Sequence, residues 1–156
     1  MKKFTIAFFS IFIQVSVALA SFCFAREPIT INQLFYKDKL YSICKTKDAI
    51  WAVGYGYEGL ILRFGVSDKF VNCKKISIGK TVSLNSVSFV GEEGWIVGND
   101  GIILHSTNNG QSWNFIDVQE KSNLFKVYFL DKNKGFIMGE HMSFYQTDDG
   151  GKKWSK

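Results

Sequence analysis

The feature that most constrains this chain is a segment of about 40 residues that occurs three times. The second copy, LNSVSFVGEEGWIVGNDGIILHSTNNGQSW, begins at Leu84, and the third, LFKVYFLDKNKGFIMGEHMSFYQTDDGGKKW, begins at Leu124. A more divergent first copy, LYSICKTKDAIWAVGYGYEGLILRF, begins at Leu40. It matches the second copy at an offset of 44 residues: Trp51 with Trp95 and Gly54 with Gly98. Repeats of this length predict a fold built from one supersecondary unit per copy.

Each copy is expected to form β structure. Val87 and Phe89 alternate with serines, which is the two-residue period of a half-buried strand. GWIVG and GIILHS are apolar runs too short for helices, and NDG at residues 99–101 predicts a hairpin turn because Asn and Gly tolerate a positive φ. WNFIDV supplies a fourth strand. The fold class is therefore all-β, with four-stranded antiparallel units the size of propeller blades; residues 65–81 are expected to give the first blade its outer strand.

Two octapeptides, STNNGQSW and TDDGGKKW, follow the pattern S-x-D-x-G-x-[ST]-W, with an asparagine for the aspartate in one and a lysine for Ser or Thr in the other. Their key residues are Ser106, Asn108, Gly110 and Trp113, and Thr147, Asp149, Gly151 and Trp154. Asn and Asp close Asx-type turns, Gly adopts a positive φ, and Trp anchors the next strand in its blade. A structural role is expected. A cation at Asp148 and Asp149 is the alternative, although one adjacent pair offers few oxygens.

These octapeptides resemble the Asp-box, or BNR repeat, of β-propellers. The surrounding pattern of Gly-Trp-Ile-Val-Gly, Gly-Ile-Ile and box is similar to the photosystem II assembly and stability factor family over residues 40–154. The resemblance implies a protein-binding scaffold or assembly factor that contacts a membrane-protein precursor. Because propellers have four to eight blades, we expect the chain to be part of a longer propeller. A ring completed by self-association, or an open stack capped by residues 26–38, is the alternative.

The N-terminal 25 residues, MKKFTIAFFSIFIQVSVALASFCFA, predict a secretory signal, with two lysines before an apolar run and cleavage after Ala20 or Ala25. We therefore expect export to a periplasm, extracellular space or lumen. If the segment is not cleaved it is an N-terminal membrane anchor, and no other membrane contact is expected. The expected divisions are 1–25 signal, 26–39 lead-in, 40–83 divergent blade, 84–123 blade with box, and 124–156 truncated blade with box.

Composition bears on several function classes. The net charge of +5 comes mostly from scattered lysines, which gives no warrant for nucleic-acid binding. A sialidase needs three arginines around its substrate carboxylate, and the chain has two, Arg26 and Arg63. A carbohydrate-binding or degenerate glycosidase-like propeller is the alternative function, and a glycan is the less favoured ligand. Carboxylates for such a site lie in predicted turns: Glu58, Glu92, Glu93 and Glu140. His105 and His141 lack neighbours at metal-ligand spacing, so no enzyme activity, metal or cofactor is expected.

Two further pairs of residues are candidates for specific roles. Cys23 either leaves with the signal or lies at the new N-terminus. Cys44 and Cys73 then either form a disulfide or remain separate thiols, because sequence spacing does not give Cα proximity. In GYGYEG, the long loop of the first copy, Tyr55 and Tyr57 are candidate contacts for a protein partner, because exposed tyrosines at loop tips favour such contacts.

Overall fold

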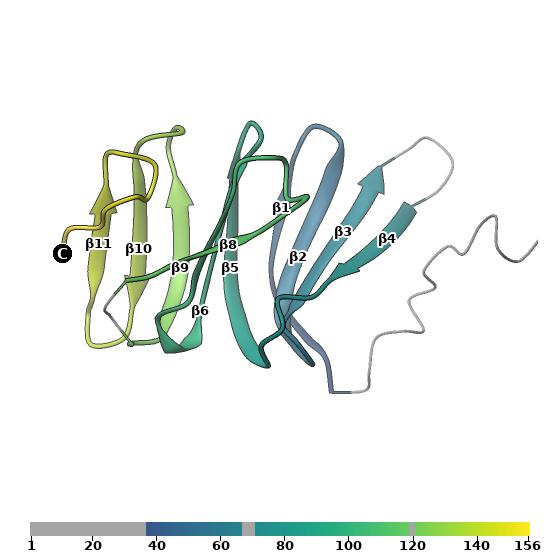
Figure 1. The fold of residues 1–156 in the computed structure, drawn as a ribbon, viewed down its shortest axis with the longest axis horizontal. Coiled ribbons are helices and arrows are strands. Elements are labelled where there is room, and N and C mark those ends of the chain that lie inside the picture. The colour runs from purple at the N-terminus through teal and green to yellow at the C-terminus, as the bar shows by residue number, and fades with distance from the viewer. Residues whose placement is uncertain (1–36, 67–70, 119–120) are drawn as a thin grey trace, which may run out of the picture. The chain divides into compact units, whose positions relative to one another are not determined.

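The computed structural model describes residues 37–66, 71–118 and 121–156, all within a compact unit that spans residues 31–156. The predicted signal, its cleavage sites and residues 26–36 of the lead-in lie outside the described residues. The described part is antiparallel β structure with one short 3-10 turn (Figure 1). Among these residues no helix has the length and apolar character needed to cross a membrane.

The strands form three successive meanders, which are blades of a β-propeller. The first blade contains β1 (Lys39–Lys45), β2 (Ala49–Gly56), β3 (Leu60–Val66) and β4 (Val71–Ile76). The second contains β5 (Val82–Val90), β6 (Glu93–Gly98), the 3-10 turn η2 (Asn99–Gly101), β7 (Ile103–Ser106) and β8 (Asn114–Ile116). The third contains β9 (Leu124–Phe129), β10 (Gly135–Gly139) and β11 (Phe144–Thr147), with one further bridge between Gln146 and Ser155. The all-β prediction is confirmed.

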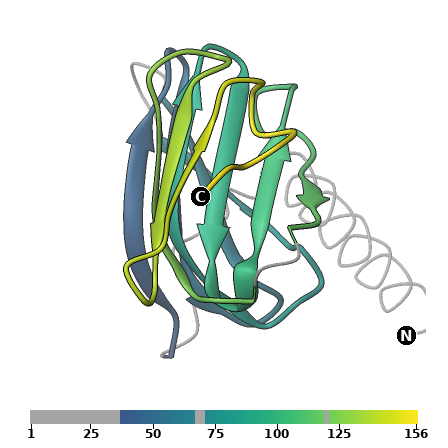
Figure 2. The same cartoon turned by 90° about the vertical axis from the view of Figure 1, so that its left-hand side faces the viewer.

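The first strands of the blades, β1, β5 and β9, lie at the contacts between neighbouring blades (Figures 1 and 2). Serine hydroxyls provide hydrogen bonds there. Ser86 Oγ donates to the carbonyl of Val127 at 3.5 Å, and Ser88 Oγ accepts from the amide of Phe129 at 3.3 Å. The alternation of serines with apolar residues in β5 therefore reflects two packed sides, one of them a neighbouring blade.

A glycine recurs at or near the end of the second strand of each blade because the backbone of the first strand passes close to it. Gly54, Gly98 and Gly139 lie opposite the leucine that precedes an irregularity in the first strand. A Cβ on Gly98 would lie 2.1 Å from the carbonyl oxygen of Ser83, and no side chain fits in that space. The glycine in the Trp-x-x-Gly pattern of the first two copies is thus required by this close approach.

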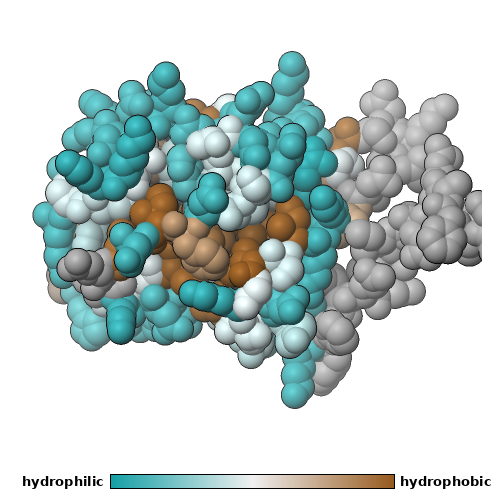
Figure 3. All heavy atoms as spheres, in the orientation of Figure 1, coloured by the Kyte–Doolittle hydropathy of each residue, from teal (hydrophilic) through white to brown (hydrophobic). Residues whose placement is uncertain are grey.

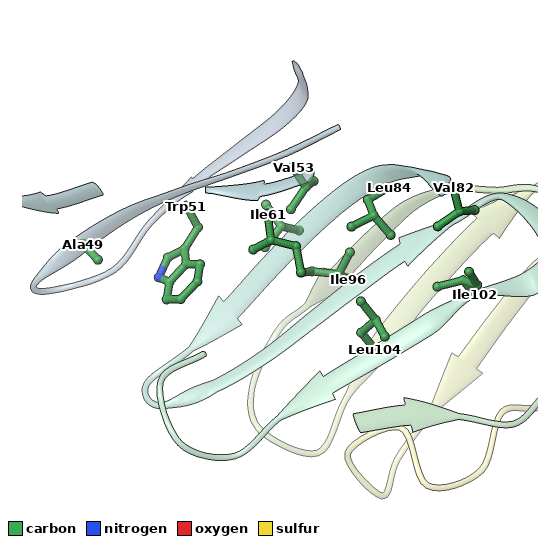
Figure 4. Packing of buried hydrophobic residues seen from close by; sticks show 10 residues of the cluster. Ala49, Trp51, Val53, Ile61, Val82, Leu84, Ile96, Ile102 and Leu104 are labelled. Carbon is green, nitrogen blue, oxygen red and sulfur yellow. The ribbon is translucent and has the colours of Figure 1, made fainter. Parts of the chain in front are cut away.

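The core lies between blades. One apolar cluster joins the first and second blades: Ala49, Trp51, Val53, Ile61, Val82, Leu84, Val87, Ile96, Ile102 and Leu104. Figure 4 shows Trp51, Val53 and Ile61 on one side of this cluster and Leu84, Ile96 and Leu104 on the other. A second cluster joins the second and third blades through Trp95 and Phe129. Each fully buried side chain of this size contributes about 1.5–3 kcal/mol, so blade stacking supplies much of the stability.

Two sequence expectations need refinement. The NDG turn lies between β6 and β7 as expected, but positive φ values fall on Asp100 (57°) and Gly101 (68°) rather than on the asparagine.

Of the two alternatives for the cysteines, the structure has separate thiols: Cys44 and Cys73 are free and half-buried. They lie on β1 and β4, with β2 and β3 between them. Three strand spacings of about 4.8 Å exceed the roughly 7 Å limit for a disulfide.

Candidate functional site

The first octapeptide folds into a turn closed by its own side chains. Ser106 Oγ donates to Asn108 Oδ1 at 2.9 Å and accepts from the amide of Gly110 at 2.9 Å. Asn108 Oδ1 also accepts from the amide of Ser112 at 3.0 Å. Asn108 can replace the usual aspartate because the turn needs one oxygen acceptor, and its amide nitrogen donates to Ser112 Oγ.

The second octapeptide repeats this geometry with a carboxylate. Thr147 Oγ1 donates to Asp149 Oδ1 and accepts from the amide of Gly151, both at 2.9 Å. The amide of Lys153 donates to Asp149 Oδ1 at 2.9 Å. That backbone hydrogen bond and the one from Thr147 hold the pKa of Asp149 below its ordinary value, because they stabilise the ionised form. Within the described residues no group of three or more His, Cys, Asp or Glu side chains could hold a metal ion.

Three aromatic rings meet beside each box, and one of them comes from the preceding blade. Trp51 stacks on Phe89 at 5.1 Å and meets Trp113 edge-on at 6.0 Å. At the next contact Trp95 stacks on Phe129 at 3.5 Å, and Trp154 meets Phe129 edge-on at 5.9 Å. The box tryptophans therefore anchor a contact between two blades as well as the strand that follows them.

The box glycines make room for the tryptophan of the preceding blade. A Cβ on Gly110 would lie 2.2 Å from Cη2 of Trp51. At the next contact, Trp95 Nε1 donates to the carbonyl of Gly150 at 3.1 Å. Sequence reasoning assigned the box glycine to turn geometry alone. The sequence signal that could have shown this is the spacing between each second-strand tryptophan and a later box glycine. Trp51 precedes Gly110 by 59 residues, and Trp95 precedes Gly151 by 56.

Polar residues connect the first and second blades beside the first box. Asp48 binds Nη2 of Arg63 at 3.0 Å and accepts from Nδ2 of Asn109 at 3.2 Å. The hydrogen bond from Asn109, with smaller effects from a backbone hydrogen bond and the charge of Arg63, holds the pKa of Asp48 below its ordinary value. Arg63 is the one arginine within the described ranges, and it pairs with Asp48 inside the first blade.

A groove of about 440 Å³ runs between the second and third blades. Its floor is apolar and its rim carries two lysines and an aspartate. The lining residues are Ile103, Asp117, Val118, Leu124, Ile137, Tyr145, Lys152, Lys153 and Trp154. Ser143 and Tyr145 occupy the strand positions in the third blade that Ile102 and Leu104 occupy in the second. Ile102 and Leu104 fill the corresponding space between the first two blades. Figure 3 shows apolar residues gathered where β8 crosses in Figure 1, with hydrophilic residues around them.

The structure separates the candidate carboxylates. The turns carrying Glu58 and Glu140 are at one end of the strands, and Glu92 and Glu93 are at the other. Three of them have local partners: Glu58 with Ser77, Glu93 with His105, and Glu140 with Asn123. His141 lies in the β10–β11 turn with a φ of 54°. Tyr55 and Tyr57 are exposed, the first in β2 and the second in the β2–β3 turn.

Successive antiparallel blades, two closed Asp-boxes and the tryptophan beneath each box define an Asp-box propeller. The model of the family described as Photosynthesis system II assembly factor YCF48 matches residues 68–122 and 112–156, more than half of the chain. The chain belongs to this family.

Known relatives agree with this assignment. The chain is 36% identical over 73 residues to the Photosystem II assembly lipoprotein Ycf48 of Synechococcus sp. (strain CC9902), covering 46% of this chain and 22% of that protein. It is 40% identical over 98 residues to Ycf48 of Nostoc sp. (strain PCC 7120), covering 61% and 29%. A solved structure of YCF48 bound to D1 peptide superposes with a TM-score of 0.67 at 26% identity, covering 79% of this chain and 42% of that one. The chain thus spans less than half the length of each of these relatives.

Proposed function

We propose that this chain is an exported, non-enzymatic assembly factor that binds an extended segment of a membrane-protein precursor. The observation that carries the proposal is membership of a family named for photosystem II assembly, one of whose solved relatives is described as bound to D1 peptide. Export follows from the predicted signal segment. Self-association is a further part of the proposal, because isolated blades leave sheet surfaces open.

The inter-blade groove is the peptide site that the geometry supports best. Its apolar floor, which includes Val118 and Leu124, suits aliphatic side chains, and its position between two blades suits an extended chain. Lys152 and Lys153 at its rim favour a ligand with a carboxylate near those side chains. The exposed Tyr55 and Tyr57 are a second contact for the same partner protein, outside the groove.

Binding of a labelled D1 peptide, followed by fluorescence anisotropy, tests this function. We expect saturable binding that weakens at least tenfold in Lys152→Glu, because a like charge then faces the peptide carboxylate. Lys132→Glu, on the exposed β9–β10 turn, is the matched control and should bind as the parent does.

Two results would count against the proposal. One is an absence of saturable binding by the folded parent chain, and the other is equal loss in both lysine variants, which would indicate charge attraction without a defined groove.

Incubation with a fluorogenic sialoside should give turnover no faster than buffer. Micromolar binding to a defined oligosaccharide on a glycan array would favour the carbohydrate-binding alternative.

A further inference from the structure

The third blade has one sheet face turned away from the second blade, and this face is largely apolar, with Lys126 paired opposite Met138 and Gln146 opposite Phe136. We define the outer face of the third blade as Tyr128, Phe136, Met138 and Phe144. Tyr128 is 57% exposed and Met138 and Phe144 about half exposed, whereas Phe136 is half-buried and stacks on Phe144 at 5.6 Å. The alternate residues of the same strands, such as Ile137, point into the core with the second blade. The outer face therefore presents aromatic and thioether side chains without a blade against them among the described residues.

Strand register shows that this face repeats the surface through which each blade packs on the next. Three positions recur in the pairing of the second and third strands of every blade. They are occupied by Trp51, Val53 and Ile61 in the first blade, by Trp95, Val97 and Ile103 in the second, and by Phe136, Met138 and Phe144 in the third. The first two sets are at most 2% exposed because the following blade covers them. All three positions stay apolar in the third blade, as a packing surface requires.

The opposite end of the stack shows the complementary surface. In β1, Leu40 is 50% exposed and Ile43 is 70% exposed. The same register positions in the second and third blades are at most 5% exposed, because the preceding blade covers them: Leu84, Val87, Leu124 and Val127. Among the described residues, nothing covers this part of the side of the first blade that corresponds to the blade-receiving side of the other two.

We propose that two copies of this chain associate head to tail, with the outer face of the third blade of one copy against β1 of the other. The contact continues the two inter-blade contacts already present in the chain. Lys45 occupies the register position of Phe89, which stacks on Trp51. In the pair, Lys45 lies over Phe136, and a cation–π contact replaces the aromatic stack. Because the two surfaces differ, the contact is heterologous and allows chains longer than dimers.

This inference specifies the surface for the self-association named under the proposed function, and it is independent of peptide binding. Light scattering after size-exclusion chromatography measures the mass of the full chain across a concentration series. We expect a mass that rises above that of the monomer with concentration. Phe144→Ser and Ile43→Ser should each weaken association at least tenfold. Met142→Ser, at a turn position that is 98% exposed, is the matched control and should associate as the parent does.

Mixing the two defective variants distinguishes this contact from a symmetric one. The third-blade variant keeps an intact β1 and the β1 variant keeps an intact outer face, so an equimolar mixture should form a dimer and nothing larger. Circular dichroism and thermal unfolding establish that each variant folds, and Met138→Lys replaces Phe144→Ser if that variant does not.

Three outcomes would overturn the proposal: a parent chain that stays monomeric at all concentrations, an Ile43→Ser variant that associates normally, or a mixture that remains monomeric. A monomeric parent that still binds the D1 peptide would refute this inference while leaving the peptide-binding function intact.

Discussion

Replacement of Gly110 by alanine tests the view that the box glycine makes room for the preceding blade. Gly110 has a φ of +69°, and an added Cβ would lie 2.2 Å from Trp51 Cη2 and 2.5 Å from its Cζ2. Alanine in the left-handed region costs about 1–2 kcal/mol, and overpacking a tight core adds about 1–3 kcal/mol. We expect the free energy of unfolding to fall by about 2–5 kcal/mol in Gly110→Ala.

Gly79→Ala is the matched control for backbone strain. Gly79 has the same φ of +69°, but an added Cβ meets nothing within 4 Å. Both variants lose the same conformational entropy of the unfolded chain, so the difference between them isolates the contact with Trp51. Urea denaturation followed by far-ultraviolet circular dichroism gives both free energies.

A second background checks the partner. In a Trp51→Leu chain the ring carbons closest to the added Cβ are gone, so the extra cost of Gly110→Ala should shrink to that of Gly79→Ala. Equal costs for the two glycine variants in the parent background would refute the reasoning, because the box glycine would then serve turn geometry alone.

Three further predictions concern the second box, the second inter-blade contact and the thiols. Hydrogen bonds hold the pKa of Asp149 below its ordinary value. The ionised carboxylate therefore stabilises the fold above the pKa of the unfolded chain, and this stabilisation is lost as the pH falls through the folded-state pKa. Asp149→Asn should make the acid unfolding curve below about pH 4 less steep, as measured by fluorescence. Trp95→Ala should lower the free energy of unfolding by about 3–5 kcal/mol, because the buried ring stacks and donates a hydrogen bond. Phe115→Ala, at a half-exposed position, should change it by less than about 1 kcal/mol; similar losses in both would contradict the inter-blade contact. Mass spectrometry of the non-reduced, folded chain should find Cys44 and Cys73 unlinked, and a linked peptide would contradict the strand order.

Features that depend on residues close in sequence could be predicted from the sequence alone. Every hydrogen bond from Ser106 and Asn108 within the first box spans four residues or fewer. The turn is therefore encoded in the octapeptide itself. The all-β class was likewise predictable, since the alternation of Val87 and Phe89 with serines is a local property of one strand.

The candidate contact surfaces were not predictable in the same way. Tyr145, which lines the groove, stands at the strand position that Leu104 occupies at the preceding blade contact. That comparison requires strand register, because an insertion shifts the sequence offset between copies. The exposure of Phe144 on the outer face also depends on which side of the sheet is covered.

By itself, the sequence determined the repeat, the strands and the closed turns, because each arises from interactions within one copy. Only the tertiary structure decided what the turns serve. Trp51 lies 59 residues before Gly110, and the packing of one blade against the next places its ring where the glycine has no side chain. The strand order within the first blade separates Cys44 from Cys73 by two strands, and among the described residues no blade covers the outer face of the third blade. The contact between Trp51 and Gly110 joins two copies, and the separation of the cysteines depends on strand order, so the residue pattern of one strand or turn contains neither.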